Sequence, residues 1–153
     1  MEFYNNEEVC FQQIKRTAKM MIGQEDIDNI KRIDIPDFDD EESEIIKELH
    51  KKLLKRSMNK NDSNEVGMLV NLQDWTNIMI NGTENGVTLK KDKAASNLIC
   101  TAPKNSLLFF HNHPKNSCFS EKDLESFMIS DAIKMMSVVC NNGRLYYLIK
   151  MDT

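Results

Sequence analysis

The sequence lacks any run of about 18 apolar residues, the length that a membrane-spanning helix needs. Its first residues, MEFYNNEEVCF, are acidic where a secretory signal would be basic and then apolar. We therefore expect neither a membrane segment nor an export signal, and we expect the protein to act in the cytoplasm.

A pair of cysteines at CxxC spacing is also missing, because the four cysteines are scattered at Cys10, Cys100, Cys118 and Cys140. This argues against a thiolate zinc knuckle and against a disulfide framework. We expect reduced side chains that serve as small apolar residues. Cys118 lies inside the motif described below, so a functional thiol is an alternative there.

The chain has no excess of basic residues. Its net charge is −4, with 11 basic and 15 acidic residues in 1–64 and nine of each in 65–153. Proteins that bind nucleic acids cluster lysine and arginine on one face. The sequence therefore carries no strong nucleic-acid signal.

What the chain does have is a globular composition, with 41% hydrophobic and 29% charged residues among 153. This length fits one compact domain with a short appendage. We place a helical N-terminal segment at 1–60 and the main domain at 61–153.

The N-terminal segment predicts two helices. Apolar residues recur at helical spacing over 6–22, and a proline then breaks the pattern. The second helix, over about 43–57, follows a capping aspartate, Asp39 or Asp40, with acidic residues in its first turn and basic residues in its last. Its apolar side should pack on a sheet. His50, beside two lysines, is expected to be a solvated surface residue.

The sequence of the second half predicts strands with two helices between them. Strands are expected at 65–71, 75–80, 87–90, 106–113, 137–140 and 145–150, the first three as a meander and the last two as a hairpin closed by NNGR. One short helix should cover 92–100. Another should begin at Ser120, with an inward stripe at Leu124, Phe127, Met128, Ala132 and Met135. The pattern predicts an α+β fold, a mixed sheet with flanking helices.

The segment HNHPKNSCFSEKD at 111–123 is the most informative part of the chain. Side chains two residues apart on a strand share a face, so His111 and His113 should point together while Asn112 points away. Zinc binds imidazole and carboxylate, and a catalytic zinc keeps three protein ligands and one open position. Asp123 is the obvious third ligand. The alternative is two ordinary histidines at the end of a strand.

Ser120 and Asp123 also match a helix capping box, in which a serine and an acid three residues later satisfy the helix start. The cap and the metal site are compatible, because the helix start would hold Asp123 toward the histidines. Hydrolysis also needs a group that takes a proton from water and delivers it to the leaving nitrogen. Glu65 could supply it, although a charged residue at a strand start is often merely solvated.

These residues resemble the signature of the JAMM/MPN (JAB-type) zinc metalloproteases, which combines a glutamate near the first strand, HxHP and SxxD. The HNHP motif is most similar to that of the RadC-like branch and of JAB domains in bacterial and phage proteins. The resemblance covers 65–150. It implies that His111, His113 and Asp123 bind zinc. It also implies a JAB/MPN-like fold over 61–153, with the three layers of cytidine-deaminase-like proteins.

The resemblance further implies that Glu65 is the general acid/base and that Ser120 stabilises the oxyanion. The expected activity is that of a zinc peptidase or isopeptidase on a protein or peptide, for example a ubiquitin-like conjugate, in a host cytoplasm if a phage encodes it. One alternative is a RadC-like metal-binding domain in DNA processing or in a mobile element. Another is a non-catalytic interaction module. The loop at 114–119 has six residues, one fewer than in typical members.

Overall fold

Six strands form the centre of the part that the computed structural model describes, residues 2–5 and 18–151. They are β1 (Glu2–Asn5), β2 (Val66–Asn71), β3 (Asn77–Asn81), β4 (Leu107–His113), β5 (Ile133–Cys140) and β6 (Leu145–Ile149). They make one sheet in the order β1-β6-β5-β4-β2-β3. Only β4 and β5 are parallel neighbours, so the sheet is mixed, and the expected α+β class is confirmed.

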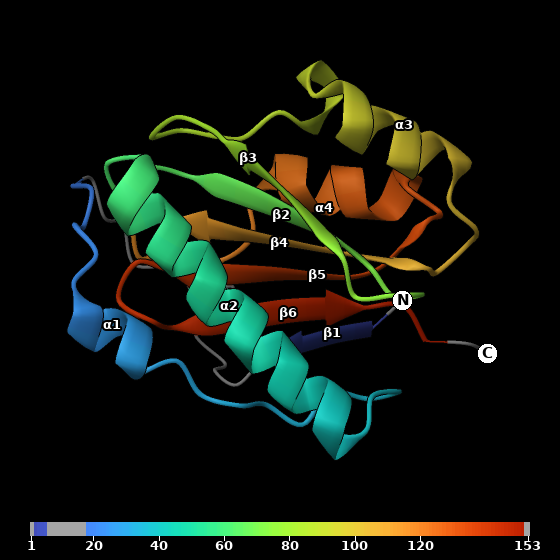
Figure 1. Cartoon of the computed structure of the whole chain (residues 1–153), viewed down its shortest axis with the longest axis horizontal. Coiled ribbons are helices and arrows are strands. Elements are labelled where there is room, and N and C mark those ends of the chain that lie inside the picture. Colours follow the sequence, from blue (N-terminus) through green and yellow to red (C-terminus); the bar gives the residue numbers. More distant parts are fainter. Residues whose placement is uncertain (1, 6–17, 152–153) are drawn as a thin grey trace.

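Helices cover both faces of the sheet and make a three-layer arrangement (Figure 1). The helix α2 (Asp40–Lys60) lies across one face, with the short α1 (Gln24–Asp28) beside it. The helices α3 (Lys93–Thr101) and α4 (Glu121–Ile129) lie on the other. Within the described residues, no helix combines the length and the apolar character that crossing a bilayer requires.

The strand β4 separates the two cores. Its even-numbered Leu108 and Phe110 pack in the cluster that contains the buried residues of α2. Its odd-numbered Leu107 and Phe109 pack with the buried residues of α3 and α4. Because side chains alternate along a strand, His111 continues the odd-numbered face and Asn112 the even-numbered face.

The helix α2 begins where its capping residues predict. Asp39 accepts a hydrogen bond from the backbone N–H of Glu42 (2.8 Å), and Glu42 accepts one from the N–H of Asp39 (3.0 Å). The apolar stripe of the helix is buried against the sheet, with Ile46, Leu53 and Leu54 at 0% exposure.

His50 is fully buried, so its prediction as a solvated surface residue was wrong. It follows Ile46 by four residues and precedes Leu53 by three, which places it on the stripe that packs on the sheet. Its Nε2 lies 2.8 Å from Ser137 Oγ, and its ring contacts that of Phe110 at 4.5 Å between centroids. Burial lowers the pKa of His50 to about 3, so the imidazole is neutral.

Several predicted elements differ from the structure. Residues 87–90 form no strand, and the 3₁₀ turn η2 (Leu89–Lys91) leads instead into α3. The helix α4 ends at Ile129, and β5 begins at Ile133 because pairing beside β4 buries that segment on both faces. Its predicted inward stripe therefore fails in part: Met128 is 60% exposed, and Ala132 and Met135 lie beyond the helix.

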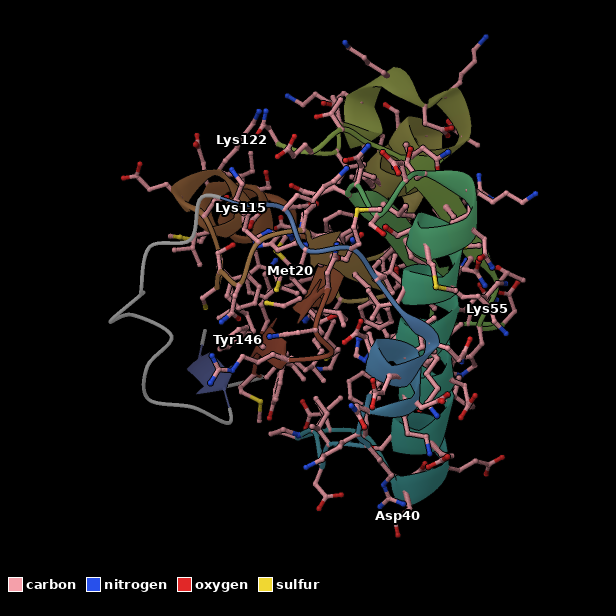
Figure 2. All side chains as sticks on the ribbon, turned by 90° about the vertical axis from the view of Figure 1, so that its left-hand side faces the viewer. Met20, Asp40, Lys55, Lys115, Lys122 and Tyr146 are labelled. Carbon is pink, nitrogen blue, oxygen red and sulfur yellow. The ribbon has the colours of Figure 1, made fainter. Side chains whose placement is uncertain are left out.

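The predicted helix at 6–22 falls mostly outside the described residues. The described part of it, 18–22, is not helical. Its backbone bonds to loops instead: Met20 N donates to Pro114 O (2.8 Å) and Ile22 N to Ser63 Oγ (2.9 Å). Figure 2 shows this segment at Met20, running beside the loop that carries Lys115.

The cysteines are not all reduced, contrary to expectation. Cys118 is disulfide-bonded, whereas Cys100 and Cys140 take part in no disulfide. The predicted hairpin at 141–144 is present and joins β5 to β6. Gly143 takes a φ of +90° there, a conformation that glycine adopts readily and other residues avoid.

Candidate metal centre

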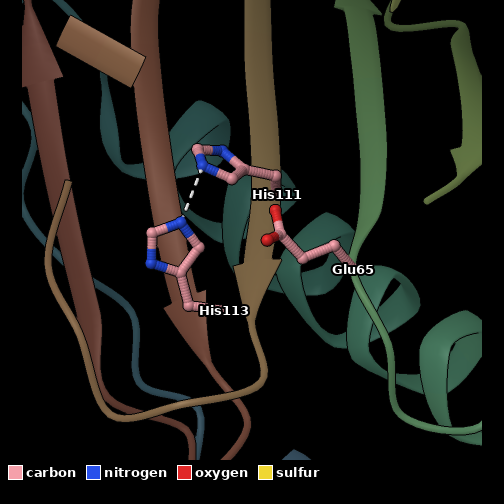
Figure 3. Close-up of side chains that lie close together, drawn as sticks. All are labelled: Glu65, His111 and His113. Carbon is pink, nitrogen blue, oxygen red and sulfur yellow. Dashed lines mark hydrogen bonds between the residues drawn. The ribbon is translucent and has the colours of Figure 1, made fainter. Parts of the chain in front are cut away.

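His111 and His113, at the end of β4, point to the same side of the sheet. Their Nε2 atoms lie 3.2 Å apart (Figure 3). Both residues are buried, with 1% and 7% exposure. The His111 ring is stacked on Phe109, with 5.1 Å between centroids and 13° between planes. The strand therefore brings two imidazole nitrogens to one buried point.

Asp123 reaches this point from the first turn of α4. Its Oδ1 lies 3.2 Å from His111 Nε2, and its Oδ2 lies 3.3 Å from His113 Nε2. The capping box holds it there: Asp123 N donates to Ser120 Oγ (3.1 Å), and Ser120 N donates to Asp123 Oδ2 (2.9 Å). One carboxylate thus caps the helix and contacts both histidines.

Glu65 enters from the residue before β2 and is also buried, at 7% exposure. One of its carboxylate oxygens and one ring nitrogen of each histidine lie within 4.8 Å of one another (Figure 3). Its backbone is held on both sides, since Glu65 N donates to Thr83 O (3.0 Å) and Gly82 N donates to Glu65 O (2.7 Å). The Glu65 carboxylate is therefore carried by a backbone segment that is held in place by hydrogen bonds.

Burial and neighbouring charges shift the pKa of three groups in this cluster. Burial raises the pKa of Glu65, although the two histidines oppose the shift. Burial would also raise the pKa of Asp123, but the imidazoles outweigh it and lower that pKa. Burial lowers the pKa of His113, but Asp123 and Glu65 outweigh it and raise that pKa. Two carboxylates around two imidazoles thus favour a positive charge among them.

The hydrogen bonds of His113 indicate which nitrogen is available. Its Nδ1 lies 3.1 Å from Ser117 O and 3.0 Å from Ser117 Oγ. A carbonyl oxygen only accepts, so we assign the proton to Nδ1. The Nε2 lone pair then faces His111 Nε2 and a carboxylate oxygen. A cation at this point would relieve the repulsion among these lone pairs, and metal-bound histidines are commonly oriented in this way.

Within the part of the chain that the structure describes, the His111 ring has no hydrogen bond like the one between His113 Nδ1 and Ser117. Its Nδ1 is buried and has no hydrogen-bond partner among the described residues. The ring is held by its stack on Phe109 and by the contact with Asp123. The buried group of Glu65, His111 and His113, with Asp123 against both imidazoles, could hold a metal ion.

Comparison of the chain with protein-family models, with curated proteins and with solved structures gives no match. The five residues singled out in the sequence, Glu65, His111, His113, Ser120 and Asp123, lie in one region of the structure, although Ser120 is exposed and its Oγ serves the cap. Sequence reasoning missed Ser117 as a partner of His113, and no pattern pointed to it. The sequence also predicted to which side of the sheet Asn112 points, but it predicted no role for this residue.

Proposed function

We propose that this protein is a zinc-dependent peptidase or isopeptidase that hydrolyses an amide bond in a protein substrate. The observation that carries the proposal is the convergence of His111, His113 and Asp123 at 3.2–3.3 Å, with the buried carboxylate of Glu65 beside them. In this proposal His111, His113 and Asp123 bind the metal. Glu65 stays available for proton transfer, as in the JAMM/MPN proteins that the motif resembles.

Zinc fits this set of donors better than magnesium or calcium, which prefer oxygen ligands. Tetrahedral zinc binds nitrogen and oxygen ligands at about 2.0–2.1 Å, which separates any two of them by about 3.3 Å. The two imidazole nitrogens lie 3.2 Å apart, close to this separation. Asp123 holds one oxygen near each imidazole, Oδ1 at 3.2 Å from His111 and Oδ2 at 3.3 Å from His113, so either oxygen is near enough to join them as a ligand.

When bound, zinc would lower the pKa of a water molecule and polarise the substrate carbonyl. Glu65 would accept a proton from that water and pass it to the leaving nitrogen. A pKa near the working pH favours a group that must both take and give a proton, and burial raises the pKa of Glu65 in that direction. Its fixed backbone would keep the carboxylate on the same side of the site throughout.

Ser120 would help to stabilise the oxyanion of the tetrahedral intermediate. Its Oγ accepts a hydrogen bond from Asp123 N, so its own hydrogen can be donated to a substrate oxygen. The side chain is exposed at the start of α4, where a substrate could reach it. A ubiquitin-like conjugate is one form that the protein substrate would take.

The first test is the zinc content of purified protein by mass spectrometry. We expect about one zinc per wild-type chain and almost none in His113→Ala. His50→Gln is the matched control, because His50 is the third histidine of the chain, equally buried but on the opposite face of the sheet. It should keep its zinc. Wild-type protein that stays free of zinc after incubation with the metal would contradict the proposal.

The second test is cleavage of quenched fluorescent peptides and of ubiquitin-like conjugates by the zinc-loaded protein. Glu65→Gln should keep zinc and lose hydrolysis by about 10²–10⁴-fold, since a positioned acid/base contributes that much. Full activity in this variant would refute the assignment of Glu65. Zinc without hydrolysis of any substrate would favour a non-catalytic interaction module.

A further inference from the structure

Asn112, between the two histidines, has a side chain with four hydrogen-bond contacts. It is fully buried and points to the face opposite the histidines. Its Oδ1 accepts from Val66 N (2.7 Å), and its Nδ2 faces three acceptors. They are Ser57 Oγ (3.2 Å), Asn64 O (3.2 Å) and Asn141 Oδ1 (2.8 Å).

Two of these bonds bracket Glu65. Val66 N belongs to the residue after it, and Asn64 O belongs to the residue before it. The paired register of β2 and β4 runs only as far as Gly67 and His111. Beyond that pair, the Asn112 side chain takes the place of the backbone ladder and ties the Glu65 segment to β4.

Asn141 extends the network to the other histidine. Its backbone N donates to His113 O (3.0 Å), and its Nδ2 donates to Ser63 O (2.9 Å) and to Met20 O (2.6 Å). Asn141 is also fully buried. The pair Asn112–Asn141 therefore links the end of β4, the segment before β2 and the chain at Met20.

We propose that Asn112 is a positioning residue of the metal centre: from behind the sheet, its side chain fixes the end of β4, which carries the two histidine ligands, against the segment that carries Glu65. This inference rests on the proposed function. A strand delivers both metal-binding side chains to one face, while the residue between them must point to the other. Because the intervening residue is adjacent to both histidines, it joins the two histidine positions to the opposite core.

The test compares Asn112→Asp with the wild type. The aspartate keeps the shape of the side chain and the acceptor for Val66, but it replaces two N–H donors with an oxygen that faces three acceptors. We expect the zinc dissociation constant to rise about 10–100-fold, as for other residues that orient metal ligands. The absorption spectrum of the cobalt-substituted protein should also change, because it reports the geometry of the ligands.

Ser137→Ala is the matched control. Ser137 is fully buried on the same face of the sheet as Asn112, and its hydroxyl contacts the buried His50. The substitution removes this contact, but Ser137 touches neither Glu65 nor Asn112. It should lose stability in urea while keeping the wild-type zinc affinity and cobalt spectrum. If Asn112→Asp does not fold, Ser57→Ala removes one acceptor of the Asn112 amide and should weaken zinc binding about two- to fivefold.

The outcomes separate the two proposals. Wild-type protein that binds no zinc overturns both the proposed function and this inference. Wild-type protein that binds zinc, together with folded Asn112→Asp or Ser57→Ala that keeps the wild-type affinity and cobalt spectrum, overturns only the inference. A loss of zinc affinity in Ser137→Ala as large as that in Asn112→Asp would also overturn it, because general destabilisation would then explain both.

Discussion

Asp123, in the first turn of α4, lies 3.2 Å from His111, near the end of β4, measured from Oδ1 to Nε2. The same carboxylate accepts the backbone N–H of Ser120 through its other oxygen, at 2.9 Å. The start of the helix and the end of the strand are therefore joined through one side chain. Changes to this carboxylate should affect the metal centre more than the fold.

Asp123→Asn should test this separation. The amide keeps an oxygen that can accept the Ser120 N–H, but it removes the negative charge beside two imidazoles. We expect zinc affinity to fall by 100-fold or more, about 3 kcal/mol, since a ligand is lost. Isothermal titration with zinc measures it. Glu121→Gln removes a carboxylate from the same turn without touching the cluster, and it should leave the affinity unchanged.

Ser120→Ala should separate capping from catalysis. Loss of the N-cap side chain should lower the free energy of unfolding by about 1 kcal/mol in urea denaturation. If Ser120 also donates to the oxyanion, the rate of hydrolysis should fall about 10²–10³-fold. Asp39→Ala removes the equivalent cap of α2 and should cost similar stability without a loss of rate. Equal rates in the two variants would limit Ser120 to capping.

His50 should make stability depend on pH. Its pKa is about 3 in the folded protein and about 6.5 when unfolded, because burial disfavours the charged form. Below pH 6.5 the unfolded chain takes up a proton that the folded protein refuses. This contribution is therefore fully present above pH 6.5 and is lost as the pH falls toward 3. Between pH 7.5 and pH 5 the loss should be about 2 kcal/mol.

Urea denaturation of zinc-free wild type and His50→Gln at both pH values measures this effect. Glutamine does not titrate, so the variant should lack the loss that His50 causes. The other two histidines are the same in both proteins, and their contribution cancels in the difference. Equal losses in the two proteins would show that His50 is not the origin of the pH dependence.

Gly143→Ala should destabilise the hairpin between β5 and β6. The position has a φ of +90°, and an added Cβ would lie 2.9 Å from Asp26 O. A backbone conformation of this kind costs a residue other than glycine about 1–3 kcal/mol. Gly86→Ala is the control, because its Cβ would meet nothing within 4 Å. Thermal unfolding of both variants should show a lower midpoint only for Gly143→Ala.

Local chemistry was sufficient to predict several elements. The aspartate cap placed the start of α2, the serine cap placed the start of α4, and the NNGR turn placed the last hairpin. Period-two alternation predicted that His111 and His113 share a face and that Asn112 takes the other. Each of these features depends on residues only a few positions apart, so a short stretch of sequence is enough to predict it.

Predictions failed where a distant partner decides the outcome. Met135 was predicted to lie on the inward face of a helix, but pairing beside β4 places it in the strand β5. His50 was predicted to be exposed because two lysines follow it, but the packing of α2 on the sheet buries it against Phe110. Composition around a residue says little about which side of its helix meets the core.

The sequence by itself determined the donors of the candidate site: two histidines on one strand face and a carboxylate held by a helix cap. Only the tertiary structure decided how they meet. Antiparallel pairing of β2 with β4 brings Glu65 to the histidines, and packing of α4 brings Asp123. The Asn112 network behind them joins segments far apart in the chain. Such contacts arise from the folded sheet as a whole, because no local rule sets the distance between residues on separate strands.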